Sequence, residues 1–164
     1  MGGMHNVENS LVAIAIAKYL GIEDVKILSA IASFKGVKRR FEYIIKSPNK
    51  VFIDDYAHHP EELRALISST KSLYPAKKLT VIFQPHLFTR TRDFADGFAE
   101  SLSIADQAII LPIYQAREKP IEGVSSSMIG DKVKTSVSLI DYESVESYVE
   151  KQKPELLVTA GAGD

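Results

Sequence analysis

Cysteine is missing from this 164-residue chain. Its absence excludes disulfide bonds, thiolate nucleophiles and thiolate metal ligands. Apolar residues make up 45% of the chain and charged residues 25%, as is usual for a globular protein with a core of useful size. A lack of cysteine is also compatible with a reducing compartment such as the cytoplasm.

A strong net charge and a long apolar run are missing as well. The formal charge is −1 and the isoelectric point is about 6.4, so there is no general electrostatic reason to bind nucleic acid or an anionic membrane. The most apolar run, Leu11 to Ala17, is seven residues long, whereas a membrane span needs about 20. We therefore predict a buried helix face there. The first residues lack a basic flank followed by an apolar stretch, so we expect no secretion signal.

The phosphate-binding motif G-x-x-x-x-G-K-[ST] does not occur anywhere in the chain. If the protein handles ATP, either the phosphate cradle lies outside this chain or only the base and sugar of the nucleotide are held here.

The pattern that is present combines two helices with an alternating strand and helix succession. Helices are predicted from residue 9 or 10 to 20 and from 24 to 35, followed by a hairpin of strands 41–46 and 51–54. Further strands are expected at 79–83, 108–113, 137–140 and 156–159, and further helices at 60–74, 91–104, 125–133 and 143–151. This alternation predicts a mostly parallel sheet covered on both faces, with a domain junction at residues 35–40.

Polar residues gather directly after the predicted strands, where open parallel sheets bind their ligands. The four segments are 54–60, 84–90, 114–120 and 160–163, and three of the four histidines lie in them. We therefore predict that the functional site is built from these loops.

Structural interpretations compete with functional ones in these loops. Asp54 and Asp55 could be only a strand end followed by a helix cap. His58 and His59 are a weak zinc pair, since consecutive side chains rarely point at one ion and no third ligand follows at helical spacing, so no metal ligands are assigned. Arg90 and Arg92 could be only a solvated helix start. The helix dipole disfavours a cation at that end unless an anion is held there, and this favours binding of a carboxylate or phosphate.

Four motifs in this order resemble the Mur ligase family: Gly3–Asn9, Phe34–Glu42, Asp54–Pro60 and Gln84–Asp93. Segments 118–121 and 160–163 extend the resemblance over essentially the whole chain. It implies a Rossmann-like α/β domain at residues 38–164 that receives the incoming amino acid and lacks its last helix. Residues 1–37 would be the final helices of the central ATP-binding domain.

The resemblance also implies an activity. The chain would be the carboxy-terminal part of an ATP-dependent, cytoplasmic bacterial ligase that joins L-alanine to UDP-N-acetylmuramate in peptidoglycan biosynthesis. ATP would convert the muramoyl carboxylate to an acyl phosphate, which the alanine amine attacks. The phosphate loop and the Mg²⁺ ligands would lie outside this chain. We therefore expect the chain to be inactive as a ligase when alone.

The functional residues that the resemblance implies form two groups. The nucleotide group consists of His5, Asn6 and Asn9 for adenine, Arg40 for phosphate, and Asp55, or else Asp54, for the ribose hydroxyls. The amino acid group consists of Tyr56 and His58 around the side chain and amine, and of His86 and Arg90 at the carboxylate. His58, His86 and Arg90 would also be catalytic.

Two alternatives stay open at this point. A murein peptide ligase, which attaches a preformed peptide to the same sugar, would need a wider pocket, and a non-catalytic nucleotide-binding module would need no amino acid pocket. A phosphoacceptor receiver domain is disfavoured, because neither residues 83–84 nor 113–114 place an aspartate at the end of a central strand. Some relatives carry an arginine at the position of Leu87, so a second anion contact is not expected there.

Overall fold

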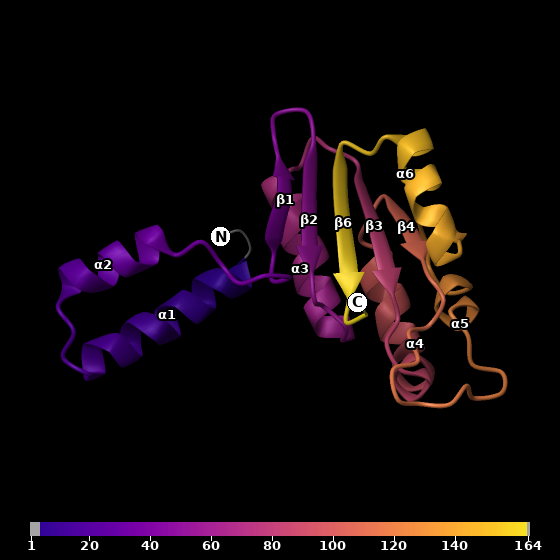
Figure 1. Cartoon of the computed structure of the whole chain (residues 1–164), viewed down its shortest axis with the longest axis horizontal. Coiled ribbons are helices and arrows are strands. Elements are labelled where there is room, and N and C mark those ends of the chain that lie inside the picture. Colours follow the sequence, from indigo (N-terminus) through magenta and orange to yellow (C-terminus); the bar gives the residue numbers. More distant parts are fainter. Residues whose placement is uncertain (1–3, 164) are drawn as a thin grey trace.

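The computed structural model describes residues 4–163, which form a six-stranded sheet flanked by helices and preceded by a helical pair (Figure 1). The helices are α1 (Met4–Tyr19), α2 (Asp24–Ser33), α3 (Pro60–Leu73), α4 (Phe88–Leu102), α5 (Ser127–Gly130) and α6 (Val145–Gln152), with a 3₁₀ turn, η1 (Tyr142–Ser144), before α6. The strands are β1 (Glu42–Lys46), β2 (Val51–Asp55), β3 (Leu79–Gln84), β4 (Gln107–Ile110), β5 (Ser136–Leu139) and β6 (Leu156–Gly161).

The sheet order is β1-β2-β6-β3-β4-β5, so the last strand of the chain lies between β2 and β3. Only β1 is antiparallel to its neighbour, and β2, β6, β3, β4 and β5 run parallel. The loops that follow these five strands therefore start from the same edge of the sheet. The predicted class, a mostly parallel Rossmann-like sheet with an amino-terminal hairpin and two preceding helices, is confirmed.

The two faces of the sheet have separate cores. On one face α3, α4 and α5 bury the larger cluster, in which Leu63, Phe83 and Phe98 are fully buried. On the other face α6 packs through Val145 and Val149 against Ile109 and a few neighbours. The connection from β5 through α6 back to β6 is what allows both faces to be covered.

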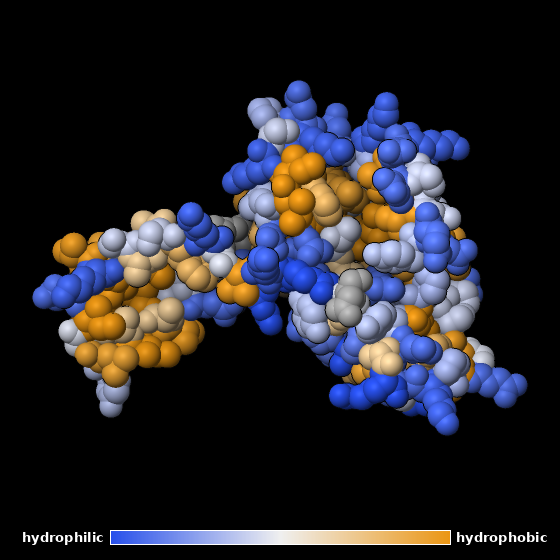
Figure 2. Space-filling model, in the orientation of Figure 1, coloured by the Kyte–Doolittle hydropathy of each residue, from blue (hydrophilic) through white to orange (hydrophobic). Residues whose placement is uncertain are grey.

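Helices α1 and α2 pack side by side and project away from the sheet as an arm (Figure 1). The prediction of a buried face at 11–17 is wrong within the described residues, since Leu11, Val12 and Ile16 are each more than half exposed. The reason is that α2 alone lies beside most of α1, and the apolar side chains form an open surface on the arm (Figure 2). Across residues 4–163 no helix is both long and apolar enough to cross a membrane.

Several element bounds differ from the predicted ones. α1 begins at Met4, and neither Asn9 nor Ser10 caps it. β4 ends at Ile110 instead of 113, since Pro112 has no N–H for the strand ladder. The helix predicted at 125–133 is only α5, four residues long, in a segment rich in serine and ending at Gly130. α4 begins at Phe88, which brings Arg90 into its first turn.

Burial of α3 provides a direct test of this fold. Leu63 is fully buried and Leu73 is 47% exposed on the same helix. We expect Leu63→Ala to lower the free energy of unfolding by about 2–5 kcal/mol, because it removes buried methyl groups and leaves a cavity. Leu73→Ala, the matched control, should change it by roughly 0.5 kcal/mol or less. Urea unfolding measures both, and equal effects would contradict the assigned helix face.

Candidate functional site

The loops after β3 and β4 are joined at the carboxyl edge of the sheet. His86 and Tyr114 form an isolated parallel bridge. The backbone N–H of Leu87 donates to the carbonyl of Tyr114 at 3.0 Å, and that of Tyr114 donates to the carbonyl of Pro85 at 2.8 Å. These bonds extend the β3–β4 pairing beyond the strands and fix the position of His86.

Four aromatic rings from three loops form a chain across this edge. The ring centroids of Tyr56 and His58 are 5.2 Å apart, those of His58 and His86 6.2 Å, and those of His86 and Tyr114 5.8 Å. Arg90 reaches back from α4, with Nη1 at 3.2 Å from Nδ1 of His86. The structure therefore brings together all four residues predicted for the amino acid group.

The surroundings of His86 favour its neutral form. Its pKa is lowered from the ordinary 6.5 by burial, then by the positive charge of Arg90 and by His58, while Glu118 opposes the shift. A neutral imidazole has one N–H donor and one acceptor nitrogen, so the site presents polar atoms of both kinds beside a fixed guanidinium.

Glu118 occupies the amino terminus of α4 from the loop after β4. Its carboxylate accepts hydrogen bonds from the Thr89 hydroxyl at 2.6 Å and from the Thr89 N–H at 3.0 Å. These bonds lower the pKa of Glu118, the Thr89 hydroxyl contributing most. The Glu118 carboxylate thus offsets the positive end of the helix dipole beside Arg90. The dipole alone therefore gives no reason to expect a bound anion at Arg90. Leu87, just before the helix, has a strained φ of 70°.

A cavity of about 320 Å³ lies between the amino-terminal part of α1 and α3. It is lined by Asn6, Asn9, Arg40, Asp55, Tyr56, Ala57, Glu61, Glu62, Ala65 and Leu66. Asn6 is almost fully buried, whereas Arg40 is exposed. Five residues predicted from the sequence therefore share one cavity, and Tyr56 belongs both to this cavity and to the chain of rings.

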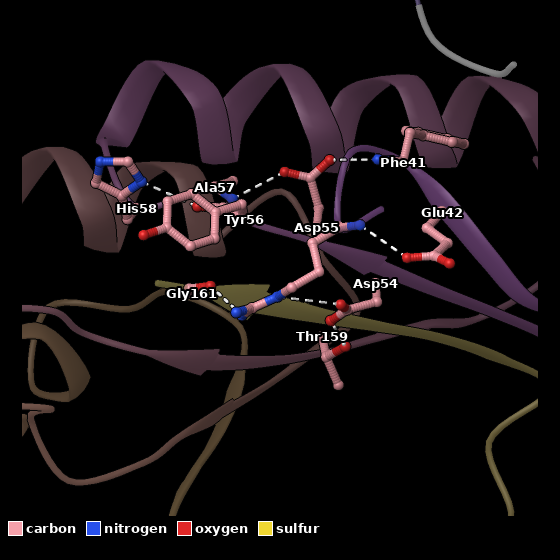
Figure 3. A network of polar contacts seen from close by, with 10 residues as sticks. Phe41, Glu42, Asp54, Asp55, Tyr56, Ala57, His58, Thr159 and Gly161 are labelled. Carbon is pink, nitrogen blue, oxygen red and sulfur yellow. Dashed lines mark hydrogen bonds and ion pairs between the residues drawn. The ribbon is translucent and has the colours of Figure 1, made fainter. Parts of the chain in front are cut away.

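Asp54 and Asp55 lie on opposite sides of the sheet, as successive residues of a strand must (Figure 3). Asp55 faces the 320 Å³ cavity, and its carboxylate accepts the backbone N–H groups of Phe41 at 2.6 Å and Ala57 at 2.8 Å. Asp54 lines a different cavity of about 730 Å³ near α6, where it accepts the Thr159 hydroxyl. Of the two carboxylates, only that of Asp55 lies beside the asparagines.

Arg39 is a residue of the site that the sequence reasoning passed over. Its Nε lies 3.4 Å from the Asp54 carboxylate, its Nη2 donates to the carbonyl of Gly161 at 2.7 Å, and its guanidinium lies 5.1 Å from the centre of the Tyr56 ring. Arg39 thereby joins the ends of β2 and β6 and supports Tyr56. The sequence did contain a signal for Arg39, because Arg39 and Arg40 are adjacent at the predicted domain junction. Only Arg40 was assigned a function from the sequence.

Glu62 is a second residue that was passed over. One of its carboxylate oxygens accepts the backbone N–H groups of His58 at 3.0 Å and His59 at 3.2 Å, and also lies 3.5 Å from Nδ1 of His58. Glu62, at the third helical position, is the acidic half of a capping box, and the cap position holds His59 in place of the usual serine or threonine, so the sequence signal was incomplete.

His5 and His59 are the other two histidines of the chain. The side chain of His5, in the first turn of α1, lies outside the described part of the chain. His59 packs its ring against Phe94 with centroids 5.0 Å apart, separately from the His58 and His86 pair. Within residues 4–163 no three histidine, aspartate or glutamate side chains gather as a metal site.

The geometry defines a Rossmann-like α/β domain with a cluster of polar and aromatic side chains at its carboxyl edge. Residues 39–163 match the family described as Mur ligase, glutamate ligase domain, and the chain belongs to the Mur ligase family. It is 48% identical, over 99% of its length, to the UDP-N-acetylmuramate–L-alanine ligase of Flavobacterium johnsoniae. It spans 36% of that relative, about a third of its length.

Solved structures agree with this assignment. The UDP-N-acetylmuramate-alanine ligase of Thermotoga maritima is 30% identical to this chain, with a TM-score of 0.81. The match extends over 100% of this chain and 36% of the T. maritima chain. A murein peptide ligase of Psychrobacter arcticus is 24% identical, with a TM-score of 0.66 over 99% of this chain and 35% of its own. The second likeness concerns the fold alone.

The Glu118 cap predicts a pH dependence of stability. Because the folded-state pKa of Glu118 lies below the ordinary 4.5, its contribution is complete above that value and is lost as pH falls through the lowered pKa. We expect Glu118→Gln to destabilise the protein at neutral pH and to match the original chain in strong acid.

Urea midpoints measured from roughly pH 2 to 7 follow this difference. Glu122→Gln, which changes an exposed residue of the same loop, should leave the midpoints nearly unchanged. A destabilisation by Glu118→Gln that is the same at every pH would contradict the assignment of the cap.

Proposed function

We propose that this chain is the amino acid-receiving part of an ATP-dependent ligase that joins L-alanine to UDP-N-acetylmuramate in bacterial peptidoglycan synthesis. The supporting observation is the cluster of His58, His86 and Arg90 beside the cavity lined by Asn6 and Asp55. The names of the relatives that cover nearly all of the chain point to the same substrates.

The amino acid is assigned to the group formed by Tyr56, His58, His86 and Arg90, which is called the ring cluster below. Arg90 and the neutral His86 offer donors for a carboxylate, and a hydrogen bond to a charged group contributes about 1.5–3 kcal/mol. Tyr56 and His58 surround the small side chain and the amine from the opposite loop. These residues hold the amino acid in one orientation, which is how a binding site lowers the barrier to attack by a nucleophile.

The nucleoside of ATP is assigned to the 320 Å³ cavity, whose volume is at the small end of the roughly 300–1,000 Å³ of ligand pockets. Amides such as Asn6 and Asn9 can pair with the edge of adenine, as they do on DNA bases. Asp55 lines the same cavity and is the acceptor for a ribose hydroxyl, in place of Asp54, while Arg40 reaches the phosphates. ATP, held with Mg²⁺ by other parts of the enzyme, activates the sugar carboxylate as an acyl phosphate.

The chain divides, in this proposal, into residues 1–37 from the end of the ATP-binding domain and residues 38–164 as the amino acid domain. The arm has an exposed apolar face, as expected if residues 1–37 pack against the rest of an ATP-binding domain. The enzyme would act in the cytoplasm, where its nucleotide substrates are made.

A chimeric enzyme tests the proposal. We expect this chain, exchanged for the matching third of the F. johnsoniae ligase, to support ATP-dependent addition of L-alanine to UDP-N-acetylmuramate and to discriminate against a tripeptide. Preference for the tripeptide would instead identify a murein peptide ligase. A folded chimera inactive with both acceptors would contradict the proposal.

Arg90→Ala in that chimera should raise the KM for alanine roughly 10- to 150-fold, the equivalent of one charge-assisted hydrogen bond. Arg92→Ala is the matched control, because Arg92 lies two positions along the same helix and pairs with Asp93 at 2.8 Å. An equal rise for both variants would contradict the carboxylate role of Arg90.

The isolated chain should show no ligase turnover with UDP-N-acetylmuramate, ATP and alanine, because its sequence holds no phosphate loop. Phosphate release and product formation, measured by chromatography, check this expectation. Turnover above the rate of a heat-inactivated sample would contradict it.

A further inference from the structure

The proton on His58 is placed by its neighbours. Nδ1 of His58 lies 2.9 Å from the carbonyl oxygen of Tyr56, and a carbonyl can only accept a hydrogen bond. The Glu62 carboxylate, 3.5 Å from the same nitrogen, is also an acceptor. The neutral ring therefore carries its proton on Nδ1, and Nε2 keeps its lone pair. Figure 3 shows this second nitrogen on the side of the ring away from Tyr56.

The proton on His86 is placed the other way round. Nδ1 of His86 lies 3.2 Å from Nη1 of Arg90, and a guanidinium can only donate. Nδ1 must therefore be the acceptor, and the neutral ring carries its proton on Nε2. A second proton on Nδ1 would face the guanidinium directly. Of the charged and titratable groups around His86, Arg90, His58 and Arg117 lower its pKa and Glu118 raises it.

We propose that His58 and His86 are held as opposite tautomers, which makes His58 the proton acceptor for the amine of the incoming amino acid and His86 a hydrogen-bond donor to its carboxylate. The inference rests on the proposed function and deepens it, because it assigns different chemical tasks to two histidines of one cluster. The two imidazole rings, whose centroids are 6.2 Å apart, then offer one acceptor nitrogen and one N–H donor to the same amino acid.

The proton transfer is balanced within the site. An ammonium N–H bond breaks, the proton forms a new N–H bond at Nε2 of His58, and the electron pair left on the amine attacks the carbonyl carbon of the acyl phosphate. The displaced carbonyl electrons move onto the carbonyl oxygen and return as the C–O bond to phosphate breaks. Phosphate leaves with the electrons of that bond and takes the second proton of the former ammonium, so that the amide nitrogen ends neutral. The imidazolium that forms keeps its Nδ1–H on the Tyr56 carbonyl and beside the Glu62 carboxylate, a base oriented by a third group. Glu62 is in turn fixed by capping α3.

Nitrogen NMR of the labelled chain tests the tautomers without any activity. Above the pKa of the rings, the ¹⁵N shifts should show the proton of His58 on Nδ1 and that of His86 on Nε2, with single-histidine variants providing the assignments. Arg90→Ala should return His86 to a mixture of tautomers and raise its pKa, while leaving His58 unchanged. A proton found on Nε2 of His58, or on Nδ1 of His86, would overturn the inference.

Paired amide variants in the chimera test the two tasks. Asparagine places its amide near the Nδ1 position of a histidine, and glutamine places it near Nε2. His58→Asn can still donate to Tyr56 but has no base, so kcat with alanine should fall about 10²–10⁴-fold. The loss should shrink with hydroxylamine, whose amine is already unprotonated at neutral pH.

His86→Gln keeps a donor at the outer position and should retain a KM for alanine within about threefold, whereas His86→Asn should raise it by about tenfold or more. An unchanged kcat for His58→Asn, or an equal loss with alanine and hydroxylamine, would overturn the base role. If the original chimera were inactive while the NMR tautomers were as stated, the proposed function would fail and the tautomer assignment would stand.

Discussion

The parallel pairing of β6 between β2 and β3 is the constraint on which the site depends. It aligns the ends of three strands that are far apart in the sequence, with Asp55 opposite Ala160 and Phe83 opposite the same residue. The loops that carry His58 and His86 start from these ends, and their rings meet only because the strands are in register. Arg39 reinforces the alignment, since its guanidinium binds the ends of both β2 and β6.

The alternation of side chains along β2 then separates structural from ligand-facing groups. Asp54 turns toward Arg39 and Thr159 on the α6 side, and Asp55 turns toward the cavity under α1. A slip of one residue in the register would exchange the two carboxylates. The same strand end continues into Tyr56 and His58, so one short segment contacts both the cavity and the ring cluster.

Much of this arrangement was predictable from the sequence, because strand periodicity and strand-end polar residues follow simple rules. The six strands, the long helices α3 and α4, and the gathering of His58, His86 and Arg90 belong to that part. The partners of Arg39 and Glu118 were not predictable, since Gly161 lies 122 positions and Thr89 lies 29 positions away from them. The exposed face of the arm was misjudged because apolar periodicity reports which side chains favour burial and not whether a partner is present in the chain.

The central claim is that the loops at the carboxyl edge hold an amino acid beside a nucleoside. A crystal structure of the active chimera with L-alanine and a non-hydrolysable ATP analogue tests it most directly. The account predicts the amino acid between His58 and Arg90, with its carboxylate toward Arg90, and the adenine against Asn6. Alanine bound instead in the 730 Å³ cavity on the α6 side, beside Asp54 and Thr159, would contradict it.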